Sequence, residues 1–273
     1  MNGLKTGQDG LMSVQAYRLS TEDTEKPPVK EDCKIAIEGP VTIEVEDFGT
    51  YTVFCTPDDK RAMAVGFLFS EGVIDAVGDI ALLNECMDDP NVIRVKLGET
   101  APKGEGHGRN LLIVSSCGAC GSESIEEKLA GLAVVGNTLK IKSDVLHIAG
   151  KALSERQVLF RQTGGTHGIG IFTETGEMIS FAEDIGRHNA LDKAIGKLLL
   201  AGRKTAGLGA VLSGRVSLEM VSKSARAGIE VISAVSAPTS LGLEAATRCN
   251  ITLCAFVRAD RATVFANPER ILN

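Results

Sequence analysis

The pattern of hydrophobic and polar positions is most regular in the C-terminal third of the chain. Short apolar runs at 209–212, 229–235 and 251–257 predict buried strands. Amphipathic segments at 218–227 and 241–249 lie between these runs and predict helices. Strands that alternate with helices are typical of an α/β fold with a mostly parallel sheet and right-handed crossovers.

The N-terminal part of the chain follows a different pattern. Residues 41–45 and 51–54 alternate between apolar and polar side chains on either side of Asp47-Phe48-Gly49, which predicts a β-hairpin. Thr56 and Pro57 come next, and they predict the cap and the first position of a helix. A hairpin followed by a helix indicates a small α+β unit.

Changes in composition divide the chain into three predicted parts. Residues 1–30 are polar, contain two successive prolines and lack a sustained period, which predicts a mobile arm or an edge element. Residues 31–108 contain the hairpin and the helix and are predicted to form a small α+β domain. Residues 109–273 are predicted to form the larger α/β domain.

Length, charge and hydropathy argue against several classes of protein. The chain has 273 residues, of which 44% are hydrophobic, enough to bury a large core. The net charge of −6 and the lack of tryptophan argue against a general nucleic-acid-binding protein. No apolar run approaches the roughly 20 residues of a transmembrane helix, and the first residues include no apolar signal segment. We therefore expect a cytoplasmic protein that binds neither nucleic acid nor a membrane.

Two cysteines form the motif of greatest chemical interest. They follow an apolar run at 111–114 that predicts a strand, and they precede Ser124-Ile-Glu-Glu127, a capping box that predicts a helix. Cys117 and Cys120 would therefore occupy a strand-to-helix turn, where backbone N–H groups and the helix dipole favour the thiolate. A Cys-x-x-Cys pair by itself is compatible with redox exchange, metal binding and sulfur transfer.

The other cysteines and the missing zinc ligands argue against a metal site at the Cys-x-x-Cys pair. They are scattered singly along the chain, which is not a disulfide framework, and we expect Cys249 and Cys254 to be small buried hydrophobic residues. A structural zinc site needs four ligands, and the sequence contains one close cysteine pair, so we expect no bound metal. The glutamate that zinc deaminases place two residues after a histidine is missing as well.

A second group of polar residues surrounds the start of a predicted helix. The segment 183–189 precedes residues with leucine and isoleucine on one helical face, and Asn189 is placed to cap that helix. Capping does not account for the neighbouring Asp184, Arg187 and His188. These three side chains are therefore candidates for binding a ligand or handling protons.

Three polar loops follow the three C-terminal strands, at 213–215, 236–240 and 258–261. Ligands of α/β sheets bind at the carboxyl ends of the strands, and these loops bring hydroxyls, arginines and two helix N-termini to that edge. Such a rim would suit an anionic, phosphate-bearing ligand. For any one loop, helix capping by Thr239 or Ser240 together with solvated arginines explains the same residues equally well.

Several motifs, taken together, support a family assignment. They are Thr56-Pro57, Gly66–Gly72, Ser116–Gly121, Thr163–His167, Glu183–Lys193, Ser213–Arg215, Lys223 and Ser236–Ser240. From about residue 35 to the C-terminus the chain resembles the FdhD family, the sulfur carriers required for formate dehydrogenase.

The resemblance implies both a fold and a function. The fold would be a cytidine-deaminase-like α/β core with a mixed or mostly parallel sheet, flanking helices and a small second domain, working as a homodimer. A cysteine desulfurase would deliver a persulfide sulfur to Cys117, with Cys120 as its partner in relay or exchange. The sulfur would pass to molybdenum bis(molybdopterin guanine dinucleotide) before this cofactor enters formate dehydrogenase, and fragments such as GDP or GMP would bind as well.

The resemblance and the rim loops together predict the cofactor-binding residues. These are His167, Asp184, Arg187, His188, Ser213, Gly214, Arg215, Ser236, Thr239, Ser240, Phe256, Val257, Arg258, Ala259, Asp260 and Arg261, of which 256–261 match the family's pterin-cofactor-binding stretch. Two alternatives remain. A dithiol redox protein would lose its activity equally with either Cys117 or Cys120, and a non-covalent cofactor chaperone would need neither.

Overall fold

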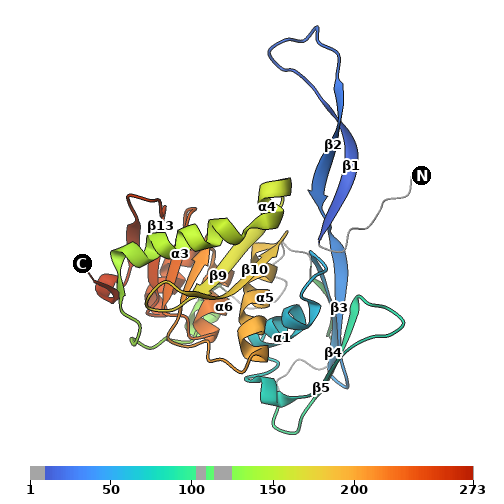
Figure 1. Ribbon diagram of the computed structural model, residues 1–273. Helices are drawn as coiled ribbons and strands as arrows, with labels where there is room; N and C mark the ends of the chain where they lie inside the picture. Colours follow the sequence, from blue (N-terminus) through green and yellow to red (C-terminus); the bar gives the residue numbers. More distant parts are fainter. Residues whose placement is uncertain (1–9, 103–108, 114–124, 273) are drawn as a thin grey trace.

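The computed structural model describes residues 10–102, 109–113 and 125–272, and these residues form a mixed α/β fold. Figure 1 shows a body with helices on both faces of a central sheet, a second sheet beside it, and a long hairpin that stands away from both. The predicted turn with Cys117 and Cys120, and the predicted cap Ser124, lie outside the described residues.

The central sheet has six strands in the order β10-β9-β11-β12-β13-β14. Their bounds are β9 (His167–Phe172), β10 (Met178–Asp184), β11 (Gly209–Leu212), β12 (Val231–Ala234), β13 (Thr252–Ala255) and β14 (Thr263–Ala266). Only β11, β12 and β13 run parallel, whereas the β9–β10, β9–β11 and β13–β14 pairs are antiparallel. The prediction of a mixed sheet is thus confirmed, and the prediction of a mostly parallel sheet is wrong. Short connections such as 173–177 cannot cross over a sheet, so the strands that they join are antiparallel.

Helices cover both faces of this sheet, because side chains along each strand alternate between the faces. Leu212 on β11 packs into the core on the side of α5 (Arg187–Leu200), α6 (Leu218–Arg226) and α7 (Ser240–Arg248). Val211 faces the other way, into the cluster formed with α3 (Ser143–Arg156). The predicted alternation of strands and helices in this part of the chain is confirmed.

The second sheet has five strands in the order β5-β6-β3-β4-β7. Their bounds are β3 (Gly39–Val45), β4 (Gly49–Cys55), β5 (Ile80–Glu85), β6 (Val92–Leu97) and β7 (Arg109–Ile113). The predicted hairpin is the antiparallel β3–β4 pair, and β7 joins β4 in parallel. The domain boundary that we predicted after residue 108 therefore falls between two strands of one sheet.

A close helix crossing joins the two sheets. Helix α1 (Lys60–Ser70) packs on the second sheet, and it also lies against α5 of the central one. A Cβ atom on Gly66 would lie 1.8 Å from the carbonyl oxygen of Asp192, and one on Gly196 would lie 1.9 Å from that of Ala62. Backbone therefore touches backbone at two reciprocal glycines, which only glycine permits.

The N-terminal segment contains secondary structure that the sequence analysis did not predict. Where we expected a mobile arm or an edge element, β1 (Leu11–Arg18) and β2 (Val29–Ala36) form an antiparallel hairpin. The shorter elements are η1 (Val77–Asp79), α2 (Ile125–Ala130), β8 (Ile141–Lys142), α4 (Val158–Thr163), η2 (Pro268–Arg270) and β15 (Ile271–Leu272). None of the helices among the described residues is long and apolar enough to span a bilayer.

Candidate functional site

The three predicted rim loops meet at one edge of the central sheet. The N–H of Val216 donates to the carbonyl of Ala237 at 3.1 Å, and the N–H of Thr239 donates back to Val216 at 2.9 Å. The N–H of Phe256 reaches the carbonyl of Ser236 at 3.3 Å. The loops that follow strands β11, β12 and β13 are therefore held together, as the parallel part of the sheet predicts.

Basic side chains gather where the first of these loops meets β9, and His167, Arg187 and Arg215 are here called the basic cluster. Gly214 lies against His167, since a Cβ added to Gly214 would sit 3.1 Å from the Nδ1 atom of His167 and 3.8 Å from Cδ of Arg187. The loop is fixed by a hydrogen bond of 3.0 Å from the N–H of Gly168 to the hydroxyl of Ser213. Glycine at 214 keeps the space beside the imidazole open.

Electrostatics in the basic cluster favour an anionic ligand. Burial, together with the positive charges of Arg187 and Arg215, lowers the pKa of His167. Burial and the neighbouring Arg215 also lower the pKa of Arg187. Two guanidinium groups near one another repel, so an anion placed between them would relieve a cost that the free protein bears.

Helix α5 carries two of the candidate residues at its N-terminus. Gly186 is the N-cap residue and α5 begins at Arg187, so Arg187 and His188 occupy the first turn, at the positive end of the helix dipole. The prediction that Asn189 caps this helix is wrong. Its amide instead donates to the carbonyl of Phe54 at 2.9 Å and to Oδ1 of Asp184 at 3.0 Å, and so ties α5 to the second sheet.

Glu219 was missed by the sequence analysis. Its Oε2 atom lies 2.8 Å from Nε2 of His188, and this contact is the main reason why the pKa of Glu219 is lowered, against the effect of burial. A carboxylate on one ring nitrogen fixes the orientation of the imidazole. In the sequence, a glutamate in the first turn of α6 has an ordinary explanation in the helix dipole, so no local signal pointed to His188.

Asp184 is the last residue of β10 and lies just before the start of α5. Its side chain is fully buried, and its oxygens accept hydrogen bonds from the N–H of Gly186 at 2.8 Å and the N–H of Thr56 at 3.1 Å. Lys193 adds an ion pair at 2.7 Å. We predicted that Asp184 binds the ligand, but these contacts lie within the protein and give it the role of holding the start of α5.

Thr56 also departs from its predicted role. Helix α1 begins at Lys60, with Asp59 as its N-cap residue, so Thr56 neither caps the helix nor is followed by its first position. The hydroxyl of Thr56 accepts a hydrogen bond from the N–H of Ile185 at 3.3 Å. The Thr-Pro motif therefore joins the second sheet to the segment that leads into α5.

Asp192 and Lys223 form a second buried ion pair, beside that of Asp184 and Lys193. The carboxylate of Asp192 accepts from the hydroxyl of Ser70 and from Nζ of Lys223, each at 2.7 Å, and Lys223 also contacts Glu71 at 3.3 Å. Although burial disfavours the ammonium, Asp192 and Glu71 hold the pKa of Lys223 above its ordinary value. These side chains fasten α1, α5 and α6 to one another.

The third rim loop contains one arginine that is bonded to the backbone and one that is not. The guanidinium of Arg258 donates from Nη1 to the carbonyls of Val235 and Val257, both at 2.8 Å. Arg261 is 72% exposed and lies 3.6 Å from the carboxylate of Asp260. Both arginines are exposed, but of the two predicted phosphate ligands Arg258 is the one whose guanidinium is already bonded to backbone carbonyls.

Strain and helix capping affect two further rim positions. Phe256 has a φ of 53°, which is costly for an aromatic residue, and its exposed ring packs at 6.0 Å from that of Phe265. The hydroxyl of Thr239 accepts from the N–H of Gly242 at 3.1 Å. For Thr239, helix capping is thus a sufficient explanation.

Three cysteines among the described residues lie in the core. Cys55, Cys249 and Cys254 are fully buried, as we predicted for the last two. Burial raises the pKa of Cys55 and Cys254 to about 12 and that of Cys249 to about 11. Thiols of this kind stay protonated near pH 7 and are poor nucleophiles.

The strand that leads toward Cys117 ends near α5. Ile113, the last residue of β7, pairs in parallel with Val53 of β4. The next residue, Phe54, accepts the hydrogen bond from Asn189 in the first turn of α5. The carboxyl ends of β4 and β7 therefore lie beside the helix turn that carries Arg187.

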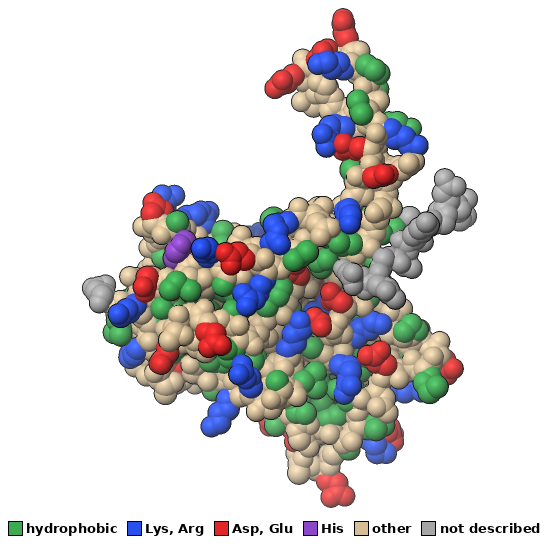
Figure 2. Space-filling model, viewed as in Figure 1, with side chains coloured by type: hydrophobic (Ala, Val, Ile, Leu, Met, Phe, Trp, Pro, Cys, Tyr) green, Lys and Arg blue, Asp and Glu red, His purple; other side chains and the backbone are tan. Residues whose placement is uncertain are grey.

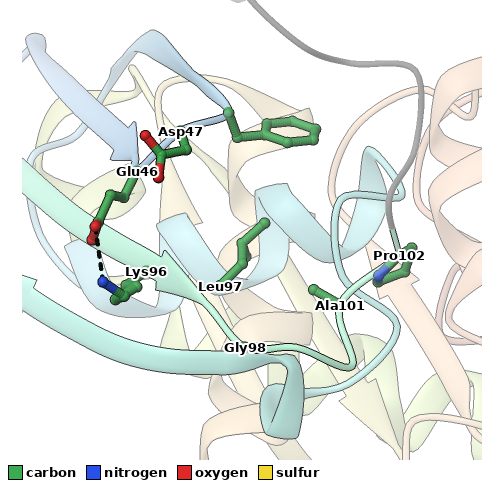
Figure 3. Close-up of a pocket in the computed structure, with 8 residues that line it drawn as sticks. Glu46, Asp47, Lys96, Leu97, Gly98, Ala101 and Pro102 are labelled. Carbon is green, nitrogen blue, oxygen red and sulfur yellow. Dashed lines mark hydrogen bonds and ion pairs between the residues drawn. The ribbon is translucent and has the colours of Figure 1, made fainter.

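A pocket at the other end of the second sheet is separate from this site. It lies at the turn from β3 to β4 and is lined by Glu46, Phe48, Lys96 and Leu97, among others (Figure 3). Nζ of Lys96 lies 2.8 Å from Oε1 of Glu46, so this cation is already paired. Among the described residues, no group of three or more histidine, cysteine and acidic side chains could hold a metal ion.

Comparison with known proteins identifies the relatives of this chain. A model of the FdhD/NarQ family matches residues 36–272. A sulfur carrier protein FdhD from Saccharolobus solfataricus is 37% identical over 243 residues, which cover 87% of this chain and 90% of the relative. A second sulfur carrier protein FdhD, from Sulfurisphaera tokodaii, is 34% identical, and the match covers 96% of this chain and 100% of the relative.

A solved structure shares the fold. It is a crystal structure of a protein from Desulfotalea psychrophila that is provisionally named a formate dehydrogenase accessory protein. The two chains are 28% identical, the TM-score is 0.75, and the match covers 96% of this chain and 99% of the other.

Proposed function

Because the chain belongs to the FdhD/NarQ family, we propose that it is a sulfur carrier that serves formate dehydrogenase. In this proposal a cysteine desulfurase is the sulfur donor and Cys117 is the acceptor. The molybdenum bis(molybdopterin guanine dinucleotide) cofactor is the final acceptor and is bound at the rim. The chain works in the cytoplasm as a homodimer, and the cytidine-deaminase-like character of its sheet stays a prediction.

The first step is an exchange between sulfurs. The thiolate of Cys117 attacks the outer sulfur of the persulfide on the desulfurase, the sulfur–sulfur bond of the donor breaks, and the donor cysteine leaves as a thiolate. No net oxidation occurs, and Cys117 then carries the persulfide. The high pKa values of Cys55, Cys249 and Cys254 support Cys117 over these thiols as the nucleophile.

Delivery of the sulfur as sulfide requires two electrons, and Cys120 can supply them together with Cys117. The thiolate of Cys120 attacks the inner sulfur of the Cys117 persulfide, a disulfide forms between the two residues, and hydrosulfide leaves toward the cofactor. A cellular dithiol must then reduce this disulfide. Cys120 is therefore a relay partner, and the first sulfur transfer does not need it.

The observation that carries the proposal is the position of the end of β7 beside the first turn of α5. Cys117 follows Ile113 by four residues, which span at most about 14 Å. A ligand held by Arg187 and Arg215 would therefore be within reach of sulfur on Cys117.

The rim has the chemistry that the guanine dinucleotide arms need. A protein with a net charge of −6 must bind pyrophosphates through local cations and helix N-termini. Arg187, Arg215 and Arg261 supply guanidinium groups, whose planar fork suits phosphate oxygens. His167, with its lowered pKa, is neutral near pH 7 and can accept a proton or a hydrogen bond from the ligand.

The test is intact mass after incubation with a cysteine desulfurase and cysteine. We expect the wild type to gain the mass of one sulfur atom, which a reductant removes, and Cys117→Ala to gain none. Cys33→Ala is the matched control, because Cys33 is a free and partly exposed thiol on the hairpin, and it should behave as the wild type.

Two outcomes would contradict the assignment. A Cys117→Ala protein that gains a reducible sulfur at the wild-type rate would exclude Cys117 as the acceptor. A wild type that gains none, while Cys117 and Cys120 interconvert between dithiol and disulfide, would favour the dithiol redox alternative.

A further inference from the structure

The β1–β2 hairpin is not used by the proposed sulfur chemistry, and it has one apolar face. Pairing places Met12 opposite Ile35 and Val14 opposite Cys33, so these four side chains share a face of the two-stranded sheet. Figures 1 and 2 show the hairpin extending from the body as a narrow arm. It also lies almost entirely outside the residues that the family model matches.

The hairpin lacks the packing that a two-stranded sheet needs. An isolated pair of strands is at best marginally stable in water, and a third strand or a packed face is required. None of the residues of β1 and β2 is fully buried by the described part of the chain, and Tyr17, Val29 and Ile35 are 65%, 63% and 42% exposed. A further strand would stabilise it.

The two edges of the hairpin differ in their readiness to pair. β2 carries four charged residues between Lys30 and Lys34, and the β2 side faces α4 (Figure 1). β1 has no charge, proline or glycine from Leu11 to Tyr17. Charged edge strands resist association and neutral ones permit it, so β1 is the edge open to a new strand.

The sequence of β1 is complementary to itself. In an antiparallel pair of two β1 strands centred on Val14, each Val14 faces the Val14 of the second copy, and Met12 faces Ala16. Ser13 then faces Gln15 on the polar side. This register opposes no like charges, and it keeps both apolar faces on the same side of the sheet.

We propose that β1 pairs with β1 of a second copy of this chain, antiparallel and centred on Val14. The result is a four-stranded sheet across a two-fold axis, with the two β1 strands in the middle. Such an interface is isologous and closes on itself, as most dimer interfaces do. The inference rests on the homodimer of the proposed function and not on sulfur transfer, so the association test for β1 and the mass test for Cys117 can fail separately.

The experiment places opposite charges at Val14, the residue that would face Val14 of the second copy. Sedimentation equilibrium would be measured for the wild type, for Val14→Lys, for Val14→Glu and for an equimolar mixture of the two variants. We expect a wild-type dimer and a roughly tenfold or greater rise in the dissociation constant for each variant alone, because like charges would face one another. The mixture should regain the dimer, because its lysine faces a glutamate.

A control variant addresses the neighbouring position. Gln15→Lys faces Ser13 of the second copy and Asp32 of its own hairpin, so it should dimerise as the wild type does. A monomeric wild type would overturn the proposal, and so would variants that dimerise like the wild type. A mixture that stays monomeric would also overturn it, since general damage to the hairpin is not repaired by mixing.

Discussion

Replacing Gly66 by alanine tests the crossing of α1 and α5. Helix propensity alone predicts a gain of about 1 kcal/mol, because alanine is the better helix former. The new Cβ atom, however, would lie 1.8 Å from the carbonyl oxygen of Asp192 and 2.5 Å from the attached carbon. Contacts between non-bonded atoms need about 3.5 Å, so the helices must separate by on the order of 1.5 Å.

The expected result follows from the balance of these two effects. Overpacking of a core costs about 3 kcal/mol at the upper end of its usual range, and a contact between two backbones belongs there. We therefore expect a net loss of about 2 kcal/mol or more in the free energy of unfolding. For a domain of this size that corresponds to a fall of roughly 4–8 °C in Tm, measured by calorimetry.

Gly150→Ala is the matched control. Gly150 lies within α3, and a Cβ atom there would meet nothing within 4 Å. This variant should be more stable than the wild type by about 0.5–1 kcal/mol. If Gly66→Ala is as stable as Gly150→Ala, the close crossing of α1 and α5 is wrong.

The remaining predictions concern the site. His167 should titrate below its ordinary pKa near 6.5 in an NMR experiment, and Arg215→Ala should raise that midpoint; an unshifted midpoint in both proteins would contradict the basic cluster. Arg261→Ala should weaken GDP binding about ten- to hundredfold in calorimetric titration, whereas Arg203→Ala, an exposed arginine at the other edge of the sheet, should leave it unchanged. Metal analysis of protein purified without chelator should find no stoichiometric zinc, and one zinc per chain would refute the ligand count.

Part of the rim could be predicted from sequence because its causes are local. Each loop follows an apolar strand, and a short amphipathic helix leads from that loop to the next strand. Right-handed crossovers of this kind make the strands parallel, so the loops must lie at the same edge of the sheet. The meeting of Val216 with Ala237 and of Ser236 with Phe256 confirms that step. What each side chain binds does not follow from this pattern, as the internal bonds of Arg258 illustrate.

The rest of the site depends on pairs that are distant in the sequence. Thr56 and Asp184 are 128 residues apart, and nothing near either residue predicts their hydrogen bond. A local rule instead made Thr56 a helix cap and Asp184 a ligand-binding residue. Glu219 had a sufficient local explanation as well, and only the folded chain brings it to His188.

Strand direction was mispredicted where the connections are short. β9 and β10 are joined by five residues that include Gly176 with a φ of 83°, and a turn of this kind reverses the chain. Periodicity indicates where strands lie, but it does not give their direction. Connection lengths would have given the antiparallel pairs at β10 and β14.

The buried ammonium of Lys193 also sets the order in which the chain can fold. Although burial disfavours its charge, Asp184 and Asp58 hold the pKa of Lys193 above its ordinary value, and Asp58 lies 135 residues earlier. A fragment that ends before α5 lacks this cation, and a fragment that starts after α1 lacks Asp58 and the carbonyl of Thr56, so that Asp184 alone remains to compensate it. Contacts across so long a separation also slow folding. We therefore expect the two sheets to form in one cooperative event, late in synthesis, after residues beyond 193 have left the ribosome.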